Sequence, residues 1–327
     1  MSILVTGATG FIGTNLVRKL VARGDSVRIL RREWSNMLGL ERLPIEEHIG
    51  DVRDYEAVRK AVTGCKQIYH LAALLKIAPF ERERFHNINV EGSDNIALAA
   101  LEEGVEKLVY TSSIAAIGFG TEDNPATEET EFNLDKFKLP YIDTKRKGEQ
   151  KVLDYCESGL PAVVVNPGYV FGPWAKKPGL NKILLLAAQG KLWYYISGGL
   201  SIVDVDDVVQ GHLLAMEKGK IGKRYILSNQ NITYKELITM ANEFVGKKPP
   251  KFKIPFALML MVGYLAEGAG KLFRFNPQIS SGMARMTTIT HYVSSEKAKR
   301  ELGYTTTPLA DSFKKTFNWL KEYKYIK

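Results

Sequence analysis

A tyrosine and a lysine four residues apart are the pair in this chain whose types and spacing best suit proton transfer. Tyr141 and Lys145 open a segment with helical spacing that runs to about Glu157, so both side chains lie on one helical face. A tyrosine with an ordinary pKa of ~10 is a poor proton donor at neutral pH. A lysine cation close by favours the phenolate and lowers that pKa by roughly 1–3 units, which makes Tyr141 a candidate general acid.

Two serines precede this pair, at the end of an apolar run. Residues 107–113 predict a strand whose carboxyl end carries Ser112 and Ser113. In open α/β sheets the chemistry gathers at the carboxyl ends of the strands, where a serine can donate a hydrogen bond to a substrate. A second pair with the same spacing, Tyr323 and Lys327, has no such serines before it. Taken alone, Ser113 would also fit an ordinary turn at the end of a strand.

The first residues of the chain form a glycine-rich turn between a strand and a helix. Residues 3–5 predict a buried strand, and helical spacing then continues to Gly24. The GxxGxxG spacing fits a dinucleotide: Gly7 for a tight turn, Gly10 for the approach of a pyrophosphate and Gly13 for close packing of the helix. The free N–H groups at the start of the helix would bind the phosphates. An ordinary turn is the alternative, which this context disfavours.

The ends of the next two strands carry residues that would select the cofactor. The strand over 26–30 ends at Arg31 and Arg32, and an arginine at this position accommodates the 2′-phosphate of NADP, whereas an acidic residue binds the ribose of NAD. We therefore expect NADP(H), with NAD as the alternative, since Glu33 follows and both arginines would also fit a solvated loop. Asp51 ends the third strand and is placed to accept a hydrogen bond from adenine, while Asp54 is the better cap for the helix 55–63.

Strands and helices alternate along the first half of the chain. Residues 67–73 predict a fourth strand that ends in the small residues Ala72 and Ala73, which let the backbone lie against a cofactor. We interpret His70 as a packed strand residue rather than a catalyst. Further along, 74–84 predicts a loop over the site, 87–103 a long helix, 118–139 a loop and 162–165 a sixth strand. This alternation predicts an α/β fold with a doubly wound parallel sheet.

Composition argues against several classes of partner and site. The 327 residues are 45% hydrophobic and 25% charged, as in ordinary globular proteins, and the formal net charge is +9. The charges are scattered, so we expect no nucleic-acid partner. Cys65 and Cys156 suit a reducing compartment, and the five histidines have no metal-ligand spacing. Because Met1 leads directly into a core strand, we expect no signal peptide and a cytoplasmic protein.

The ordered set of motifs resembles the extended short-chain dehydrogenase/reductases, the superfamily of the NAD-dependent epimerases and dehydratases. The resemblance runs from Met1 to about residue 310 and implies a Rossmann sheet with a smaller, discontinuous C-terminal substrate lobe. The stretch Asn166 to Pro173 is similar to the dihydroflavonol-4-reductase-like and 3β-hydroxysteroid-dehydrogenase-like branch. The other motifs are Thr6-Gly7-Ala8-Thr9-Gly10-Phe11-Ile12-Gly13, Gly50-Asp51-Val52, His70-Leu71-Ala72-Ala73, Asn89-Val90-Glu91-Gly92, Thr111-Ser112-Ser113, Tyr141-Ile142-Asp143-Thr144-Lys145 and Leu302-Gly303-Tyr304.

The resemblance also implies a role for each member of the site. Tyr141 would donate a proton to a carbonyl or accept one from an alcohol, Lys145 would hold the nicotinamide ribose and tune Tyr141, and Ser113 would bind the substrate oxygen. Ser112 would lie behind the site or contact the cofactor, and Asn89 would lie near the nicotinamide. The residues implied to bind the cofactor are Gly7, Thr9, Gly10, Phe11, Ile12, Gly13, Arg31, Arg32, Asp51, Val52, Leu71, Ala72, Ala73, Asn89, Thr111, Ser112, Tyr141, Lys145, Pro167, Gly168 and Val170.

Two missing features narrow the activity within this superfamily. The stretch after Ser113 lacks the acidic pair that dehydratases usually carry there. Leu200 stands near the place where nucleotide-sugar enzymes often have an arginine for the diphosphate, although Lys176, Lys177 or Lys182 could substitute. We therefore expect NADP(H)-dependent reduction of a ketone or aldehyde that is dihydroflavonol-, cinnamoyl- or steroid-like. A nucleotide-sugar epimerase with tightly bound NAD(P) and a non-catalytic NADP-sensing protein are the alternatives.

Past residue 173 the chain is expected to build the substrate lobe. We predict the Rossmann domain over 1–173, with 200–217 returning to it, and the lobe over 174–199 and 218–327. The aromatic and apolar residues of this part suit a flat, greasy ketone, although most of them would also fit the core of the lobe. They are Trp174, Leu184, Leu185, Leu186, Trp193, Tyr194, Tyr195, Phe252, Phe256, Met259, Met261 and Tyr264.

One apolar stretch of the lobe admits two interpretations. Residues 254–266 are too few to span a bilayer, and we interpret them as a buried helix. The alternative is an amphipathic helix at a membrane surface, because Lys247, Lys248, Lys251 and Lys253 lie nearby. The family resemblance further implies a homodimer packed through the helices over 87–103 and 141–157.

Overall fold

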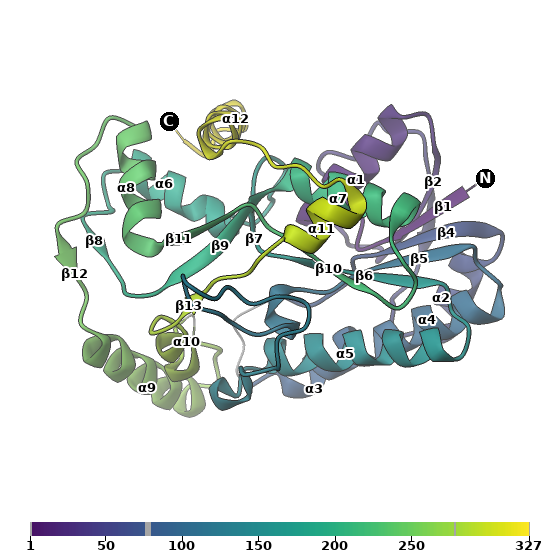
Figure 1. The fold of residues 1–327 in the computed structure, drawn as a ribbon, viewed down its shortest axis with the longest axis horizontal. Coiled ribbons are helices and arrows are strands. Elements are labelled where there is room, and N and C mark those ends of the chain that lie inside the picture. Colours follow the sequence, from purple (N-terminus) through teal and green to yellow (C-terminus); the bar gives the residue numbers. More distant parts are fainter. Residues whose placement is uncertain (1, 76–79, 278, 327) are drawn as a thin grey trace.

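A seven-stranded parallel sheet is the centre of the molecule in the computed structural model, which describes residues 2–75, 80–277 and 279–326 (Figure 1). The strand order is β10-β6-β5-β4-β1-β2-β3. The chain runs outward from β1 to β3 and then returns to β4 on the other side of β1, so the sheet is doubly wound and the predicted fold class is confirmed. The strands are β1 (Ser2–Thr6), β2 (Ser26–Arg31), β3 (Ile45–Ile49), β4 (Cys65–His70), β5 (Lys107–Thr111), β6 (Ala162–Pro167) and β10 (Arg224–Leu227).

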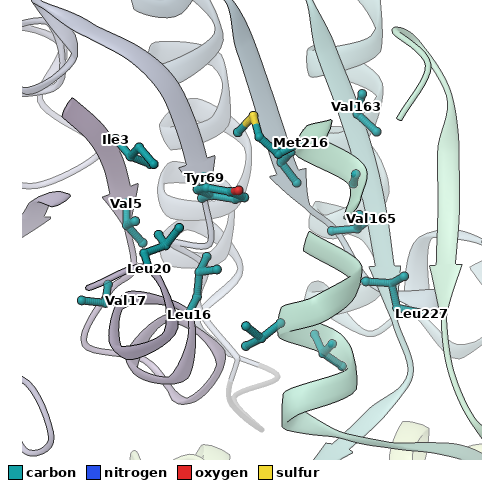
Figure 2. Close-up of a cluster of buried hydrophobic side chains, with 14 of the residues drawn as sticks. Ile3, Val5, Leu16, Val17, Leu20, Tyr69, Val163, Val165, Met216 and Leu227 are labelled. Carbon is teal, nitrogen blue, oxygen red and sulfur yellow. The ribbon is translucent and has the colours of Figure 1, made fainter. Parts of the chain in front are cut away.

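Helices cover both faces of this sheet. One face carries α1 (Phe11–Ala22), α7 (Val205–Lys218) and α11 (Glu296–Leu302), and the other carries α2 (Tyr55–Val62), α4 (Gly92–Glu102) and α5 (Pro140–Glu157). Figure 2 shows apolar side chains from α1, α7 and the strands meeting under the first face, among them Val5, Leu16 and Met216. The Asp54 side chain accepts a hydrogen bond from the Ala57 amide and caps α2, as predicted.

The long helix predicted over 87–103 is interrupted at its start. After α3 (Arg82–His86), the segment η1 (Asn87–Glu91) is a π-helix, and regular α-helix begins only at Gly92. Such π turns occur frequently at functional sites, because they turn a side chain off the helical register. Part of the loop predicted before α3, residues 76–79, lies outside the described residues. The segment 118–139 is irregular, as predicted, apart from the short 3₁₀-helix η3 (Asp135–Phe137).

A second, smaller sheet extends the molecule beyond β10. In it β9 (Gly199–Asp204) pairs with β7 (Tyr169–Phe171), β11 (Gln230–Thr233) and β13 (Thr290–His291). A two-stranded ribbon, β8 (Tyr194–Tyr195) with β12 (Phe252–Lys253), lies beyond it. The other elements of this part of the chain are the 3₁₀-helix η4 (Gly179–Asn181) and the helices α6 (Lys182–Ala188), α8 (Tyr234–Phe244), α9 (Phe256–Leu272), α10 (Ser281–Met286) and α12 (Leu309–Glu322). A further 3₁₀-helix, η2 (Ile114–Ala116), follows β5 of the large sheet.

The strand pairing adds detail to the predicted division of the chain at two places. Arg224–Leu227 hydrogen-bonds to β6 and therefore belongs to the large sheet, although we expected residues past 218 in the lobe. Conversely, β9 belongs to the small sheet, and of the predicted return over 200–217 only α7 covers the large one. Pairing between strands so distant in sequence leaves no local signal that composition could reveal.

The structure also corrects the interpretation of 254–266 as a buried helix. Residues 256–266 of this stretch fall within α9, where only Gly263 and Gly270 are buried. The helix packs through small residues and leaves large apolar side chains in solvent. Across the described ranges, no helix is both long and apolar enough to cross a membrane.

Gly148 lies where α5 comes closest to the sheet, and this contact can be tested. A Cβ there would lie 2.2 Å from the Asn89 carbonyl oxygen and 2.8 Å from the Tyr110 hydroxyl. We expect Gly148→Ala to lower the free energy of unfolding by about 1–3 kcal/mol, because the extra methyl forces the helix away from the sheet. Urea denaturation measures this change.

The matched control is Gly268→Ala in α9, where an added Cβ meets no atom within 4 Å. This variant should gain about 0.5–1 kcal/mol, because alanine loses less backbone entropy on folding than glycine does. A Gly148→Ala protein as stable as the Gly268→Ala protein would contradict the packing argument.

Candidate active site

Tyr141 and Ser113 meet at the carboxyl end of β5. Tyr141 lies in the first turn of α5, after Pro140 at the start of that helix, and Ser113 lies between β5 and η2. Burial raises the pKa of Tyr141 above its ordinary value, and a hydrogen bond with the Ser113 side chain offsets part of this increase. The Ser113 hydroxyl also accepts a hydrogen bond from the Ala115 amide at 3.1 Å. The two residues predicted for proton transfer and oxygen binding therefore lie close enough for Ser113 to affect the pKa of Tyr141.

Lys145 is on the same helix but points at the sheet rather than at Tyr141. Its Nζ donates to the Thr111 carbonyl at 2.8 Å and to the Tyr110 hydroxyl at 3.4 Å. Burial lowers the pKa of Lys145 to about 8, while the Glu149 carboxylate one turn later works in the opposite direction. The predicted lowering of the Tyr141 pKa by Lys145 is wrong for this structure: burial raises that pKa, Ser113 opposes the rise, and the Lys145 amine is directed to Thr111 and Tyr110 instead.

A buried ionic network holds the backbone of Ser113 from behind. The Asn166 amide donates to the Ser113 carbonyl at 3.0 Å and to the Glu149 carboxylate at 2.7 Å. Glu149 is 3% exposed and pairs with Arg224 of β10 at 3.2 Å. The sequence analysis missed this network, since Asn166 and Arg224 are distant in sequence from both Ser113 and Glu149.

Asn89 occupies the π turn and ties three segments together. Its side chain donates to the Thr144 hydroxyl at 3.1 Å and accepts from the Leu74 amide at 2.6 Å. Its carbonyl accepts from Ser93, whose hydroxyl lies 3.1 Å from that of Tyr110. Asn89 thus joins the segment after β4 to the first turn of α5, next to Lys145.

His70 is a packed residue, as predicted. Its Nδ1 lies 2.7 Å from the Thr6 hydroxyl, and its ring stacks on Tyr110 at 5.6 Å between centroids. Burial, with a smaller contribution from the Lys145 cation, lowers the pKa of His70 to about 3. The imidazole is therefore neutral at physiological pH and acts as a rigid spacer between β1 and β5.

The glycine-rich turn has the form of a dinucleotide cradle. Gly7 has a φ of +67°, and a Cβ on it would lie 2.5 Å from the Ala72 amide nitrogen. A Cβ on Gly13 would lie 2.2 Å from the Gly7 carbonyl oxygen, so the turn and α1 can close only with glycines. Gly10 is exposed, and no side chain of the described residues caps α1. With no acidic residue in the first turn of α1, its N–H groups suit a pyrophosphate.

Two further segments border this turn. Thr9, Phe11 and Ile12 are half-buried around Gly10. Lys176, which we considered only as a partner for a substrate diphosphate, donates to the Thr9 carbonyl at 2.9 Å and to the Asn36 carbonyl. It therefore links the glycine-rich turn to the loop after β2 instead of reaching into the substrate side.

The two arginines after β2 have different surroundings. Arg31 pairs with Glu47 of β3 and donates to the carbonyls of Arg32 and Glu33. Arg32 is exposed, and its guanidinium lies 5.8 Å from the centroid of the Trp34 ring. Burial disfavours the ionised form of Asp51, but two hydrogen bonds from Arg53 outweigh it and lower the pKa of this carboxyl. Because Arg31 is held by Glu47 and Arg32 is exposed, Arg32 rather than Arg31 is available to a ligand.

The remaining predicted cofactor residues divide between the cradle and the core. Leu71 and Ala72 follow β4 and are half-buried beside Gly7, and Ala73 after them is exposed. Val52 is buried against Gly92, and the Thr111 hydroxyl bonds to His212 at 2.8 Å inside the protein. The Ser112 hydroxyl is buried with no partner in the described part of the chain. Pro167 ends β6 and Val170 packs on the large core, while a Cβ on Gly168 would lie 2.5 Å from the Ser201 carbonyl oxygen.

The surroundings of Tyr141 are mainly apolar. It packs in one cluster with side chains from the 118–139 segment and from the region of α10, namely Phe119, Phe132, Leu139, Met286 and Ile289. Tyr169 also lies within electrostatic reach of Tyr141, and its hydroxyl is 3.2 Å from His291. Sequence reasoning missed these residues, because we looked for the pocket in aromatic runs. Trp174 from those runs packs instead on Gly39 and Arg18, and Trp193 is 60% exposed.

Known proteins are similar to this chain along almost all of its length. The model of the NAD dependent epimerase/dehydratase family matches residues 3–228. A Synechocystis sp. protein named "Putative dihydroflavonol 4-reductase" is 33% identical, over 99% of this chain and 95% of its own. "Sterol demethylase protein B" of Methylococcus capsulatus is 33% identical, over 98% of this chain and 99% of its own. The crystal structure of gox2253 superposes with a TM-score of 0.87 and 37% identity, covering 100% of this chain and 99% of that one.

The buried amine of Lys145 predicts a stability that depends on pH. Its pKa is lowered to about 8 in the folded protein from 10.5 in the unfolded chain. Below pH 8 the amine is charged in both states and its burial costs free energy, whereas between pH 8 and 10.5 the folded state sheds the proton and stability rises with pH. We expect Lys145→Met to be more stable than the parent at pH 7, with an advantage that shrinks by about 2 kcal/mol towards pH 10.

Urea denaturation at the two pH values measures this difference. Lys147→Met is the matched control, because Lys147 is exposed on the same helix and its loss should leave the pH dependence unchanged. An advantage of Lys145→Met that stays constant or grows with pH would show that the amine is not the group concerned.

Proposed function

Because this chain belongs to the NAD-dependent epimerase/dehydratase family and is an oxidoreductase of the short-chain dehydrogenase/reductase type, we propose that it reduces the carbonyl group of an apolar ketone or aldehyde with NADPH. The observation that carries this proposal is the placement of Ser113 beside Tyr141 at the carboxyl end of β5, close enough to affect its pKa, with Lys145 one turn further along α5. A bound nicotinamide supplies the hydride in such enzymes.

Each of these side chains has a task that follows from its surroundings. The Ser113 hydroxyl holds the substrate oxygen by a hydrogen bond and orients it towards Tyr141. Burial raises the pKa of Tyr141, so its hydroxyl is protonated at neutral pH. It would give that proton to the substrate oxygen as hydride transfer turns this oxygen into a much stronger base, which then becomes an alcohol. Lys145, anchored to the Thr111 carbonyl and the Tyr110 hydroxyl, would hold the ribose hydroxyls of a bound cofactor with its remaining N–H group.

The substrate class follows from what surrounds Tyr141. Tyr141 packs on the same small apolar core as five other partly buried apolar side chains, which favours a ligand with a hydrocarbon or aromatic body over a sugar diphosphate. The two relatives at 33% identity are named for a dihydroflavonol and for sterol demethylation, both of which involve fused ring systems. We therefore assign a flat, polycyclic or aromatic carbonyl compound as the substrate.

Conservative changes at the proton donor test the activity. Tyr141→Phe keeps the ring and removes the hydroxyl, and we expect kcat to fall by roughly 100- to 10,000-fold. Ser113→Ala should lower kcat by roughly 100-fold through loss of one hydrogen bond to the developing oxyanion. The measurement is NADPH oxidation against a panel of aromatic, polycyclic and aliphatic ketones and aldehydes.

Tyr155→Phe is the matched control, because Tyr155 lies on the same helix four turns from the site and should leave kcat unchanged. Full activity in Tyr141→Phe would rule out the assigned donor. Tight NADPH binding with no turnover on any carbonyl compound would refute the reductase, and nucleotide sugars would be the next ligands to test.

The cofactor preference rests on Arg32 and can be tested separately. Its exposed guanidinium is free to pair with a 2′-phosphate, while Arg31 is held by Glu47. We expect Arg32→Ser to raise the Kd for NADPH by roughly 10-fold or more and to leave that for NADH unchanged, because a charge-assisted contact is lost only with the phosphate.

Fluorescence titration with the two nucleotides gives both constants without a substrate. Arg31→Ser is the comparison variant and should change the NADPH constant by less. If Arg32→Ser weakens both nucleotides equally, the arginine contributes general charge and does not select NADP.

A further inference from the structure

The solvent face of α9 is apolar along its whole length. Met261, Leu265 and Leu272 are 52%, 65% and 75% exposed, and Leu258 completes a row at helical spacing with them. Leu258, Met261, Leu265 and Leu272 are called the α9 row below. Figure 1 shows α9 along an outer edge of the molecule, with α10 against it. A helix on a globular protein ordinarily turns its polar face to water, so this orientation is inverted.

The buried face of α9 explains why the helix is held this way round. A Cβ on Gly263 would lie 2.8 Å from the Ser281 amide nitrogen, and one on Gly270 would lie 2.7 Å from the Phe275 carbonyl oxygen. The Glu267 carboxylate lies on the same side and accepts hydrogen bonds from the Ser281 amide and hydroxyl. Rotating the helix to bury the α9 row would bring large side chains into these close contacts and break the Glu267 bonds.

The charges around the α9 row have one sign. Between residues 244 and 295 the sequence has a single acid, Glu267, which is already bonded to Ser281, and seven basic residues: Lys247, Lys248, Lys251, Lys253, Lys271, Arg274 and Arg285. All seven are exposed, and none of the five lysines pairs with a carboxylate among the residues described. This arrangement is complementary to a surface that is apolar within and negatively charged at its boundary.

Large aromatic side chains continue the surface at the start of α9. Phe252 of β12 and Trp193 pack edge to face with 5.9 Å between ring centroids, and both are about three-fifths exposed. Phe273 and Phe275 are exposed at the other end of the helix. Aromatic residues of this kind are enriched at the boundary between lipid headgroups and acyl chains.

We propose that the α9 row docks onto the surface of an anionic lipid bilayer. The apolar side chains would enter the boundary of the acyl chains, with α9 parallel to the membrane, and the flanking lysines and arginines would contact the lipid phosphates. A stretch of chain whose only acid, Glu267, is bonded to Ser281 favours this occupant over a second copy of the chain, whose identical cations would face these and repel them.

Cosedimentation of the full chain with lipid vesicles tests the proposal directly. We expect binding to vesicles of phosphatidylcholine with phosphatidylglycerol, weaker binding to phosphatidylcholine alone and weaker binding at high salt. Leu265→Glu should lower the partition coefficient by roughly tenfold or more, because it places a charge where a leucine side chain would enter the acyl-chain boundary of the bilayer. Leu272→Glu is a second variant, so that the result does not depend on one substitution folding well. Ile221→Glu is the matched control: Ile221 is as exposed as the row but lies before β10, and its loss should leave binding unchanged.

A second set of variants tests the positive rim. Lys253→Gln with Lys271→Gln should weaken binding to the anionic vesicles by several-fold and reduce its salt dependence, while Lys314→Gln with Lys321→Gln on α12 should not. NADPH binding reports folding in every variant independently of the membrane and of any carbonyl substrate.

Two results would overturn the proposal. The first is equal binding of the parent and the Leu265→Glu protein to anionic vesicles. The second is no vesicle binding by the parent together with a dimer that becomes a monomer on Leu265→Glu in analytical ultracentrifugation, which would assign the α9 row to a second copy. Neither result bears on the proposed reductase activity, because neither experiment measures turnover.

Discussion

A buried lysine amine bonded to the end of a strand fixes the geometry on which the site depends. Lys145 is 2% exposed, and its charge is compatible with the interior only while the Thr111 carbonyl and the Tyr110 hydroxyl accept from it. That requirement prevents α5 from sliding along β5. Tyr141, one turn earlier, is then held at the height of Ser113. The Glu149 carboxylate, one turn later, extends the same constraint to β6 and β10 through Asn166 and Arg224.

The close approach of α5 to the sheet has a second consequence, in the neighbouring helix. Because Gly148 brings the α5 backbone against Asn89, an ordinary α-helix at 87–91 would have to carry that side chain elsewhere. The π turn directs Asn89 towards Thr144 and Leu74 instead. One glycine and one irregular turn therefore place an amide between the segment after β4 and the first turn of α5. The unfavourable free energies of burying a cation and of forming an irregular helical turn are concentrated around these few residues, as is common at functional sites.

The sequence allowed predictions wherever the cause is local. The glycine spacing, the Asp54 cap and the shared face of Tyr141 and Lys145 each depend on a few consecutive residues, and so does the alternation that predicted the sheet. The direction of Lys145, the partner of Arg31 and the network around Glu149 depend on which strands are neighbours. No short segment encodes that Glu47 of β3 lies beside Arg31, or that Arg224 adds a strand to β6. For the same reason the sequence did not indicate the strand β10 past residue 218, although the fold class is confirmed.

The error at α9 has a different physical origin. Mean hydropathy over 254–266 measures how apolar a segment is, and a buried helix is the usual way to satisfy such a segment. What decides the orientation is which face can approach the rest of the protein, and here Gly263 and Gly270 lie at i and i+7 on a face that tolerates no Cβ. Because the face with the two glycines packs against the protein, the leucines on the other side of the helix remain exposed. The apolar exterior of α9 is therefore a consequence of its close packing.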